Sequence, residues 1–134
     1  MSTVQRVAQV FGIVFILVAL IGFITSGSSM EADPEMAPKI FGLFAVNVVH
    51  NLVHLAFGIW GVTAARSWGA AKGYCQTAGG IYLVLAGLGL VFPTAFGLIP
   101  IGGHDIWLHL LLGLVLAYVG FTAKPEGAAA RSAA

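Results

Sequence analysis

The stretch VAQVFGIVFILVALIGFIT, from Val7 to Thr25, decides the class of fold, because it is strongly apolar and carries no charged side chain. A helix of this length crosses the roughly 30 Å hydrocarbon core of a bilayer. Three further apolar runs, separated by polar or Pro/Gly-rich segments, have a comparable length. We therefore predict an all-α integral membrane protein with four transmembrane helices at about residues 7–25, 40–65, 74–92 and 106–123.

The composition supports lipid as the solvent. Of the 134 residues, 59% are hydrophobic and 8% are charged, whereas a soluble domain carries about 25% charged residues to cover its surface. The net charge of +1, without a basic cluster, excludes a typical nucleic-acid-binding surface. The single Cys75 excludes an internal disulfide and is expected to be a packing residue. The length fits one domain, with a disordered tail at about residues 124–134.

The basic residues indicate the orientation. Only Lys39 lies on one side of a four-helix alternation, beside three carboxylates, and the other five lie on the opposite side: Arg6, Arg66, Lys72, Lys124 and Arg131. Because cytoplasmic loops carry the excess of Lys and Arg, we predict that both termini are cytoplasmic. The first apolar run exceeds the core of about 7–15 residues in a signal peptide, so we expect it to be retained as a helix.

The two halves of the chain resemble each other. FGLFAVNVVHNLVHLAFG, starting at Phe41, aligns without a gap with FGLIPIGGHDIWLHLLLG, starting at Phe96. The first and third runs also align, and Gln9 then meets Gln76. Chance recurrence of Gly and Leu explains part of this similarity, but it explains the paired FGL, Gln and His less well. We predict an antiparallel bundle of two tandem two-helix repeats about a pseudo-twofold axis along the membrane normal.

A polar stripe lies within the second apolar run. Asn47, His50, Asn51 and His54 occupy about a third of the circumference of a helix. Lipid cannot satisfy the hydrogen bonds of these side chains, so the stripe should face the interior of the bundle.

The repeat predicts which residues of the fourth run face this stripe, because it equates His50 with Asp105 and His54 with His109. Each pair is spaced i, i+4 and projects from one helix face, and the pseudo-twofold axis would bring both pairs together. Three imidazoles and one carboxylate suit zinc, iron or copper. The candidate metal ligands are His50, His54, Asp105 and His109, and the supporting polar residues are Asn47, Asn51 and His104.

Other interpretations of the same residues stay open. Buried His and Asn side chains also link transmembrane helices through hydrogen bonds, each worth about 0.6–2 kcal/mol. Asp105 follows Gly-Gly-His at the start of a helix, where an N-cap is expected. His54 or His109 can serve as an axial ligand of a haem or a chlorophyll-type pigment, and the cluster can transfer protons. The segment FGLIPIGG, residues 96–103, can form a re-entrant piece.

Two motifs carry a family resemblance over nearly the whole chain apart from its tails. They are N-x-x-H-N-x-x-H, from Asn47 to His54, and G-G-x-D-x-x-x-H, from Gly102 to His109. The chain resembles uncharacterised four-helix bacterial membrane proteins that are grouped as a domain of unknown function. The resemblance implies a four-helix bundle in the bacterial inner membrane, and it implies no activity.

Two functions follow as hypotheses. Small size, short loops and the lack of a recognisable catalytic motif favour a non-enzymatic accessory or structural subunit. Such a subunit would pack against lipid and against a larger respiratory, photosynthetic or transport complex, or against its own copies. The alternative is a metal-, haem- or pigment-binding protein with a redox or transport role. A channel would require several chains, because four short helices leave little room for a pore.

Overall fold

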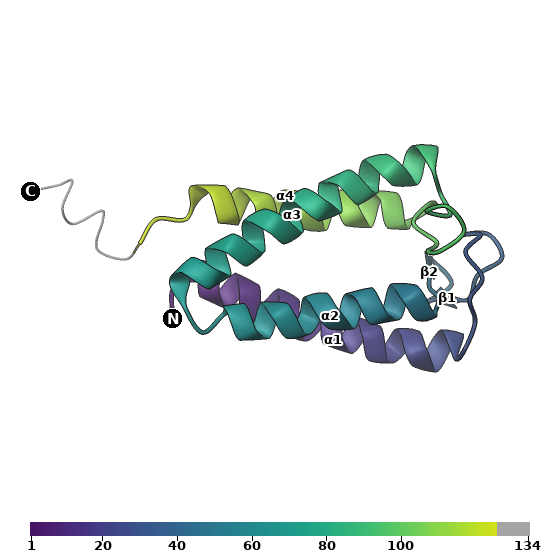
Figure 1. Cartoon of the computed structure of the whole chain (residues 1–134), viewed down its shortest axis with the longest axis horizontal. Coiled ribbons are helices and arrows are strands. Elements are labelled where there is room, and N and C mark those ends of the chain that lie inside the picture. Colours follow the sequence, from purple (N-terminus) through teal and green to yellow (C-terminus); the bar gives the residue numbers. More distant parts are fainter. Residues whose placement is uncertain (126–134) are drawn as a thin grey trace, which may run out of the picture.

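The computed structural model describes residues 1–125, which form an antiparallel bundle of helices and one short hairpin (Figure 1). The helix α1 packs along α2, and α3 packs along α4, so the bundle has two layers of two helices each. The predicted all-α bundle is thus confirmed, and most of the predicted tail lies outside the described residues. The helices are α1 (Thr3–Ser26), α2 (Val48–Ala64), α3 (Trp68–Val91) and α4 (Asp105–Thr122), and the paired strands are β1 (Lys39–Ile40) and β2 (Phe44–Ala45).

The helices have the character of membrane spans. Within the described residues, α1, α3 and α4 are long and apolar enough to cross a bilayer, with 24, 24 and 18 residues. The helix α2 is also apolar but has 17 residues, which is the lower end of the range for a span, about 17–25 residues. The chain is a membrane protein by this criterion.

The start of the second helix differs from the prediction. The predicted helix began at about residue 40, whereas α2 begins at Val48. Asn47 ends the extended segment, and its side-chain oxygen accepts a hydrogen bond from the backbone N–H of His50 at 2.9 Å, which is N-cap chemistry. Before it, Phe41 and Gly42 have φ angles of 53° and 70°, which a right-handed helix excludes. Hydrophobicity alone could not reveal this turn.

The third helix begins earlier than predicted. We expected it from Tyr74 after a basic turn, but α3 starts at Trp68. The hydroxyl oxygen of Ser67 accepts a hydrogen bond from the N–H of Ala70 at 3.3 Å, so the residues of the basic turn become the first turns of the helix. The helix α1 likewise starts at Thr3, because Ser2 and Gln5 form a capping box ahead of the apolar run.

The backbone repeats along with the sequence. Phe96 and Gly97 have φ angles of 59° and 84°, close to the values of Phe41 and Gly42, their equivalents at a shift of 55 residues. A positive φ is uncommon for a residue with a bulky side chain. The second turn differs at Ala95, whose φ is 44°, because the equivalent Ile40 lies in β1. The positive φ angles shared at Phe and Gly still support a true repeat over a chance similarity.

Helix packing repeats in the same way. A Cβ atom on Gly12 would lie 2.6 Å from the backbone nitrogen of Val62, and one on Gly79 would lie 2.5 Å from that of Ala117. A shift of 67 residues relates the glycines, and a shift of 55 relates their partners. The reciprocal contacts are also equivalent, Gly58 with Ile16 and Gly113 with Leu83. Each repeat is thus a helix pair in close backbone contact at glycine, as is common in membranes.

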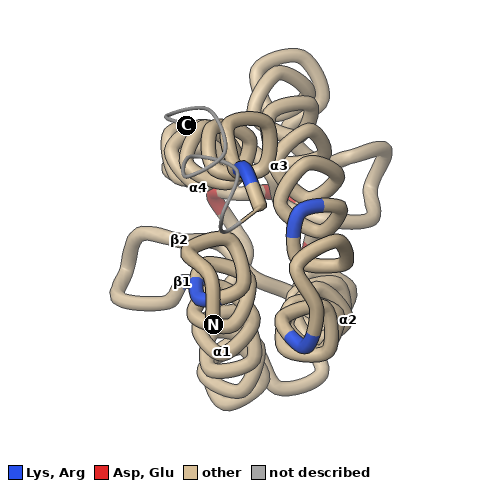
Figure 2. Tube along the Cα trace, turned by 90° about the vertical axis from the view of Figure 1, so that its left-hand side faces the viewer, with Lys and Arg blue, Asp and Glu red and all other residues tan. Residues whose placement is uncertain are grey.

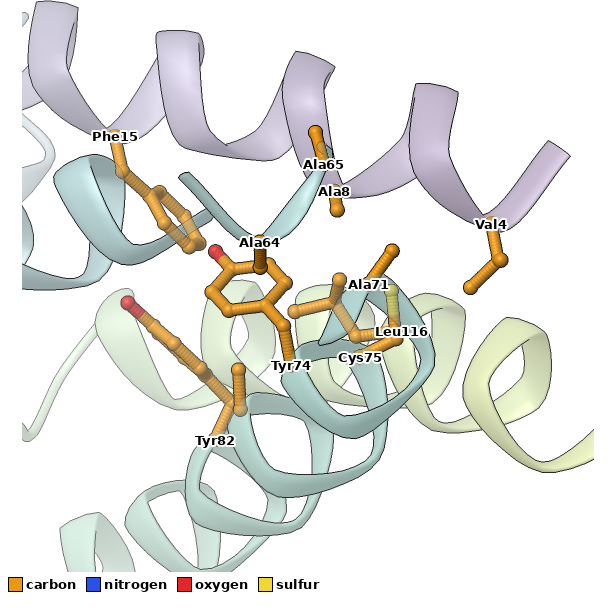
Figure 3. Close-up of a cluster of buried hydrophobic side chains, with 11 residues drawn as sticks. Val4, Ala8, Phe15, Ala64, Ala65, Ala71, Tyr74, Cys75, Tyr82 and Leu116 are labelled. Carbon is orange, nitrogen blue, oxygen red and sulfur yellow. The ribbon is translucent and has the colours of Figure 1, made fainter. Parts of the chain in front are cut away.

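The two pairs meet at an aromatic contact near the pseudo-twofold axis. Phe15 of α1 and Tyr82 of α3 occupy equivalent positions, and their rings stack at a centroid distance of 5.3 Å and an angle of 19°. Alanines pack around the buried Tyr74 in the core on the side of the termini, where Cys75 is a buried packing residue, as predicted (Figure 3). The apolar core therefore occupies one half of the bundle, and the polar stripe occupies the other.

Charges separate between the two ends of the bundle. Viewed from the end that carries the N-terminus, Figure 2 shows Lys and Arg on the segments nearest the viewer. The carboxylates of Glu31, Asp33 and Glu35 follow the opposite end of α1. This asymmetry is the one that the sequence predicts, whereas the assignment of the basic end to the cytoplasm stays a prediction.

Candidate functional site

The candidate site lies where the second and fourth helices begin. His50 is the third residue of α2, and Asp105 is the first residue of α4. One turn further along each helix are His54 and His109, so each helix presents its pair on one face. Both pairs are buried in the half of the bundle that is remote from the termini. The structure therefore brings together the four residues that the repeat equates.

Three of these residues form a compact group. The Nε2 atom of His50 lies 3.7 Å from Oδ2 of Asp105. A ring nitrogen of His109 completes the set, and the three potential ligand atoms all lie within 4.8 Å of one another. The residues are 6%, 2% and 2% exposed, respectively, so this group is shielded from water and lipid.

The group contains polar atoms that the protein leaves unpaired. Within residues 1–125, Nδ1 of His50, Oδ2 of Asp105 and Nδ1 of His109 are buried and have no hydrogen-bond partner. A buried polar group without a partner costs about 1–3 kcal/mol. Three neighbouring side chains that each bury such an atom leave room for a further partner in the group.

His54 lies beside this group and is held by the protein. Its Nδ1 is 3.2 Å from the carbonyl oxygen of His50, and its Nε2 is 3.5 Å from the hydroxyl of Tyr82. Its ring centroid is 4.3 Å from that of His50. Both ring nitrogens of His54 thus face protein partners, and its contacts orient the ring of His50.

Tyr82 is a site residue that the sequence argument missed. Its ring packs against His109 at a centroid distance of 5.3 Å, as the equivalent Phe15 packs against His54 at 5.4 Å. The available signal was the pairing of a Phe with a Tyr in the repeat, because the added hydroxyl requires a polar partner inside a membrane.

The supporting polar residues Asn47 and Asn51 also connect segments of the bundle. Asn47 caps α2 and donates through Nδ2 to the carbonyl oxygen of Leu98 at 2.9 Å, so it links the two outer segments. Asn51 donates to the hydroxyl of Ser26 at 2.9 Å and so links α2 to α1.

The remaining expectations concern the start of α4. His104 is exposed, and its Nδ1 accepts a hydrogen bond from Nε1 of Trp107 at 3.0 Å, away from the group. His104 also occupies the N-cap position, so Asp105 is not the cap. The carboxylate of Asp105 is instead buried beside His50.

The segment 96–103 is non-helical, and its residue Ile101 is buried. The carbonyl oxygen of Ile101 packs so closely on Gly89 of α3 that a Cβ at Gly89 would contact it.

Two cavities border the group and are related by the repeat. The α1–α4 cavity, of about 150 Å³, has an apolar wall that includes Val18, Phe44, Val46 and Leu108. The α2–α3 cavity, of about 160 Å³, has the equivalent residues in the same order, Leu85, Ile99, Ile101 and Val53. His50, His54 and His109 border both cavities. The polar group is therefore a wall between two apolar spaces.

These dimensions bear on the cofactor hypotheses. Pockets for drug-sized ligands measure about 300–1,000 Å³, and each cavity here is smaller, at about 150 and 160 Å³. A tetrapyrrole does not fit inside either space. Neither cavity by itself encloses a haem or a chlorophyll-type pigment.

Comparisons with known proteins agree with the resemblance in its coarse form. Neither the curated proteins nor the solved structures contain a match to this chain. A family model described as a domain of unknown function, DUF4383, matches residues 5–122. This range includes all four helices apart from the first two residues of α1. The chain therefore belongs to the DUF4383 family.

Proposed function

We propose that this membrane protein binds a divalent transition-metal ion through His50, Asp105 and His109. One observation carries the proposal: three buried side chains of metal-ligating type converge, and each has a buried polar atom without a partner in the described chain. One metal ion bound between the three side chains would give each of them a ligand bond.

The donor set and the spacing support this proposal. Two imidazoles and one carboxylate hold zinc or non-haem iron in three-ligand sites that keep coordination positions open. Around one ion, with bonds of about 2.1 Å, ligand atoms lie roughly 3–4 Å apart. The present separations reach up to 4.8 Å. A shift of about 1 Å by side-chain rotation would complete the ligand set.

The competing interpretation, a structural hydrogen-bond network, fits a different part of the cluster. His54 links α2 to α3 through the Tyr82 hydroxyl at 3.5 Å, and Asn51 links α2 to α1 through the hydroxyl of Ser26. In contrast, His50 and Asp105 are separated by 3.7 Å, which exceeds the distance of a charge-assisted hydrogen bond, about 2.7–2.9 Å. The same separation lies within the roughly 3–4 Å expected between two ligand atoms of one ion.

Metal analysis of the purified protein tests the proposal. We expect the wild-type chain, reconstituted with zinc or ferrous iron, to hold about one ion, and Asp105→Ala to lose it. His104→Ala is the matched control, because His104 is an exposed neighbour and should leave the metal content unchanged. A wild-type protein that takes up neither ion would refute the proposal, as would Asp105→Ala with full occupancy.

A second candidate function is the accessory subunit, and one surface supports it. Glycines on α3 leave the outer helix surface open, with nothing in the described chain within 4 Å of a Cβ built on them: Gly69, Gly73, Gly80 and Gly87. Small residues allow close approach of another transmembrane helix. Migration of the gently solubilised protein only as a monomer would contradict this candidate, and a complex that dissociates on Gly80→Leu would support it.

We also propose a location and an orientation for the protein. The basic residues at the end with the N-terminus favour a cytoplasmic position for both termini, in a bacterial inner membrane. Reporter fusions at the C-terminus and in the loop at residues 30–38 check this topology. Activity of a periplasm-dependent reporter at the C-terminus would overturn it.

A further inference from the structure

A different kind of cavity lies at the end of the bundle that carries the N-terminus. The start of α1, the start of α3 and the end of α4 surround a space of about 270 Å³ (Figure 1). Its lining includes side chains with hydroxyl, aromatic and ammonium groups: Ser2, Thr3, Trp68, Tyr118, Thr122 and Lys124. We propose that this basic-end cavity binds the headgroup of an anionic phospholipid. The inference is independent of the proposed metal site, which lies in the other half of the bundle.

Two lysines give the basic-end cavity its positive charge. Lys124 lines it directly. The ammonium group of Lys72 donates to the carbonyl oxygen of Ala123 at 3.0 Å and lies 5.1 Å from the ring centroid of Trp68. Ala123 and Trp68 both line the cavity, so Lys72 lies at its edge. Among residues 1–125, neither lysine forms an ion pair with a carboxylate, and the described lining contains no Asp or Glu. The positive charge is therefore available to an anion.

The backbone adds to this positive field. The first N–H groups of a helix have no acceptor within the helix, and the helix dipole places partial positive charge at the same end. The N-terminal ends of α1 and α3 both reach the cavity, at Thr3 and Trp68. The negative end of α4 reaches it as well, but the carbonyl oxygen of Ala123 already accepts a hydrogen bond from Lys72. The cavity therefore favours an anion over a cation.

The opposite end of the bundle provides a comparison. A cavity of about 380 Å³ beside the hairpin is lined by Asp33 and Glu35 as well as by Lys39. Carboxylates outnumber ammonium groups in that lining, whereas the basic-end cavity has the reverse balance. Basic pockets between transmembrane helices are a known mode of recognition of anionic lipid headgroups. Only the basic-end cavity, among the cavities at the two ends of the described chain, meets this description.

Aromatic side chains place the basic-end cavity at the level of the lipid headgroups. Trp and Tyr rings are enriched at the interface between membrane and water, where one part of the ring is in lipid and the other is wet. Trp68 is half-buried at the start of α3, and Tyr118 is 71% exposed in the last turns of α4. The cavity between them thus lies at the depth of a lipid phosphate.

A groove for an acyl chain continues from the cavity. It runs along α1 with a volume of about 220 Å³, and Thr3 borders both spaces. Arg6 lines the groove within the first turns of α1, and apolar side chains follow it along the helix, Val7, Val10 and Phe11. Basic groups that are followed by an apolar groove match a phosphate with an attached acyl chain. A soluble phosphate would leave the groove unused, so we assign the occupant as a lipid.

Native mass spectrometry of the purified full chain in detergent tests this inference with two added lipids, dioleoyl phosphatidylglycerol and dioleoyl phosphatidylcholine. We expect the anionic lipid to bind about tenfold or more tightly than the zwitterionic one, because two lysines contribute to its binding. Lys124→Gln should lower the affinity for phosphatidylglycerol by about fivefold, the effect of one basic residue at an anionic lipid surface. Arg66→Gln is the matched control. Arg66 is an exposed basic residue near the same end but outside the lining, so its loss should leave the affinity unchanged.

Equal affinity for the two lipids would overturn the inference. Equal losses in Lys124→Gln and Arg66→Gln would also overturn it, because the attraction would then belong to the whole basic end and not to the cavity. Glycerol 3-phosphate, added at the same concentration as phosphatidylglycerol, separates a lipid site from a soluble-phosphate site. We expect it to displace no lipid, and displacement at equal concentration would refute the assignment of a lipid.

Discussion

The two repeats of this chain share a scaffold and differ in their chemistry. Gly12 and Gly79 make equivalent backbone contacts, so the helix pair is built twice in the same way. The positions near the axis differ, because the first repeat has His50 where the second has Asp105. The packing positions therefore preserve the fold, and the divergent positions along the shared axis supply a carboxylate next to imidazoles.

The largest expected effect separates the two histidines that the repeat equates. His109→Ala removes a proposed ligand and should lower metal affinity by more than about 100-fold, whereas His54→Ala removes a residue that orients a ligand and should cost about 10–100-fold. Competition with a chromophoric chelator measures both affinities. If the two variants lose the same affinity, the assigned asymmetry between the repeats is wrong.

The shared scaffold predicts a loss of stability at one glycine and not at its neighbour. Gly79→Ala forces a Cβ to 2.5 Å from the backbone of Ala117, and such overpacking costs typically about 1–3 kcal/mol. Gly80→Ala places its Cβ where nothing described lies within 4 Å, so it should not destabilise. Unfolding in detergent compares the two variants, and similar losses would argue against close packing of α3 on α4.

The pseudo-twofold axis predicts that the metal ligands tolerate an exchange. His50→Asp alone or Asp105→His alone should lose metal, and the double variant should recover affinity to within about tenfold of wild type, because coupled neighbours are not additive. The same chelator competition detects this rescue. Additive losses would show that His50 and Asp105 do not share one ion.

The smallest expected effect concerns Tyr82→Phe. This change makes the residue identical to Phe15, its equivalent in the first repeat. The variant loses the contact with His54 at 3.5 Å, and polar contacts of this kind between transmembrane helices average about 0.6 kcal/mol. We expect a small loss of stability and a modest loss of metal affinity. A gain in stability on removal of this hydroxyl would show that it lacks a productive partner.

Much of the bundle could be predicted from the sequence, since apolar length and helical periodicity are local properties. The runs before Thr25 and after Asp105 became helices close to the expected residues. The predicted second helix, residues 40–65, is longer than α2, because residues 40–45 are as apolar as the span that follows. The pairing of β1 with β2 and the positive φ angles at Phe41 and Gly42 show that the chain turns there.

The candidate site was likewise predictable only in part from the sequence. The sequence by itself determined that His50, His54, Asp105 and His109 share one region, because the repeat and the i, i+4 spacing follow from residue order alone. The tertiary structure decided that both ring nitrogens of His54 face protein partners, while buried atoms of the other three residues have no hydrogen-bond partner among residues 1–125. Such a distinction depends on distances between helices that are remote in sequence, and those distances are set by how closely the glycines let the backbones approach.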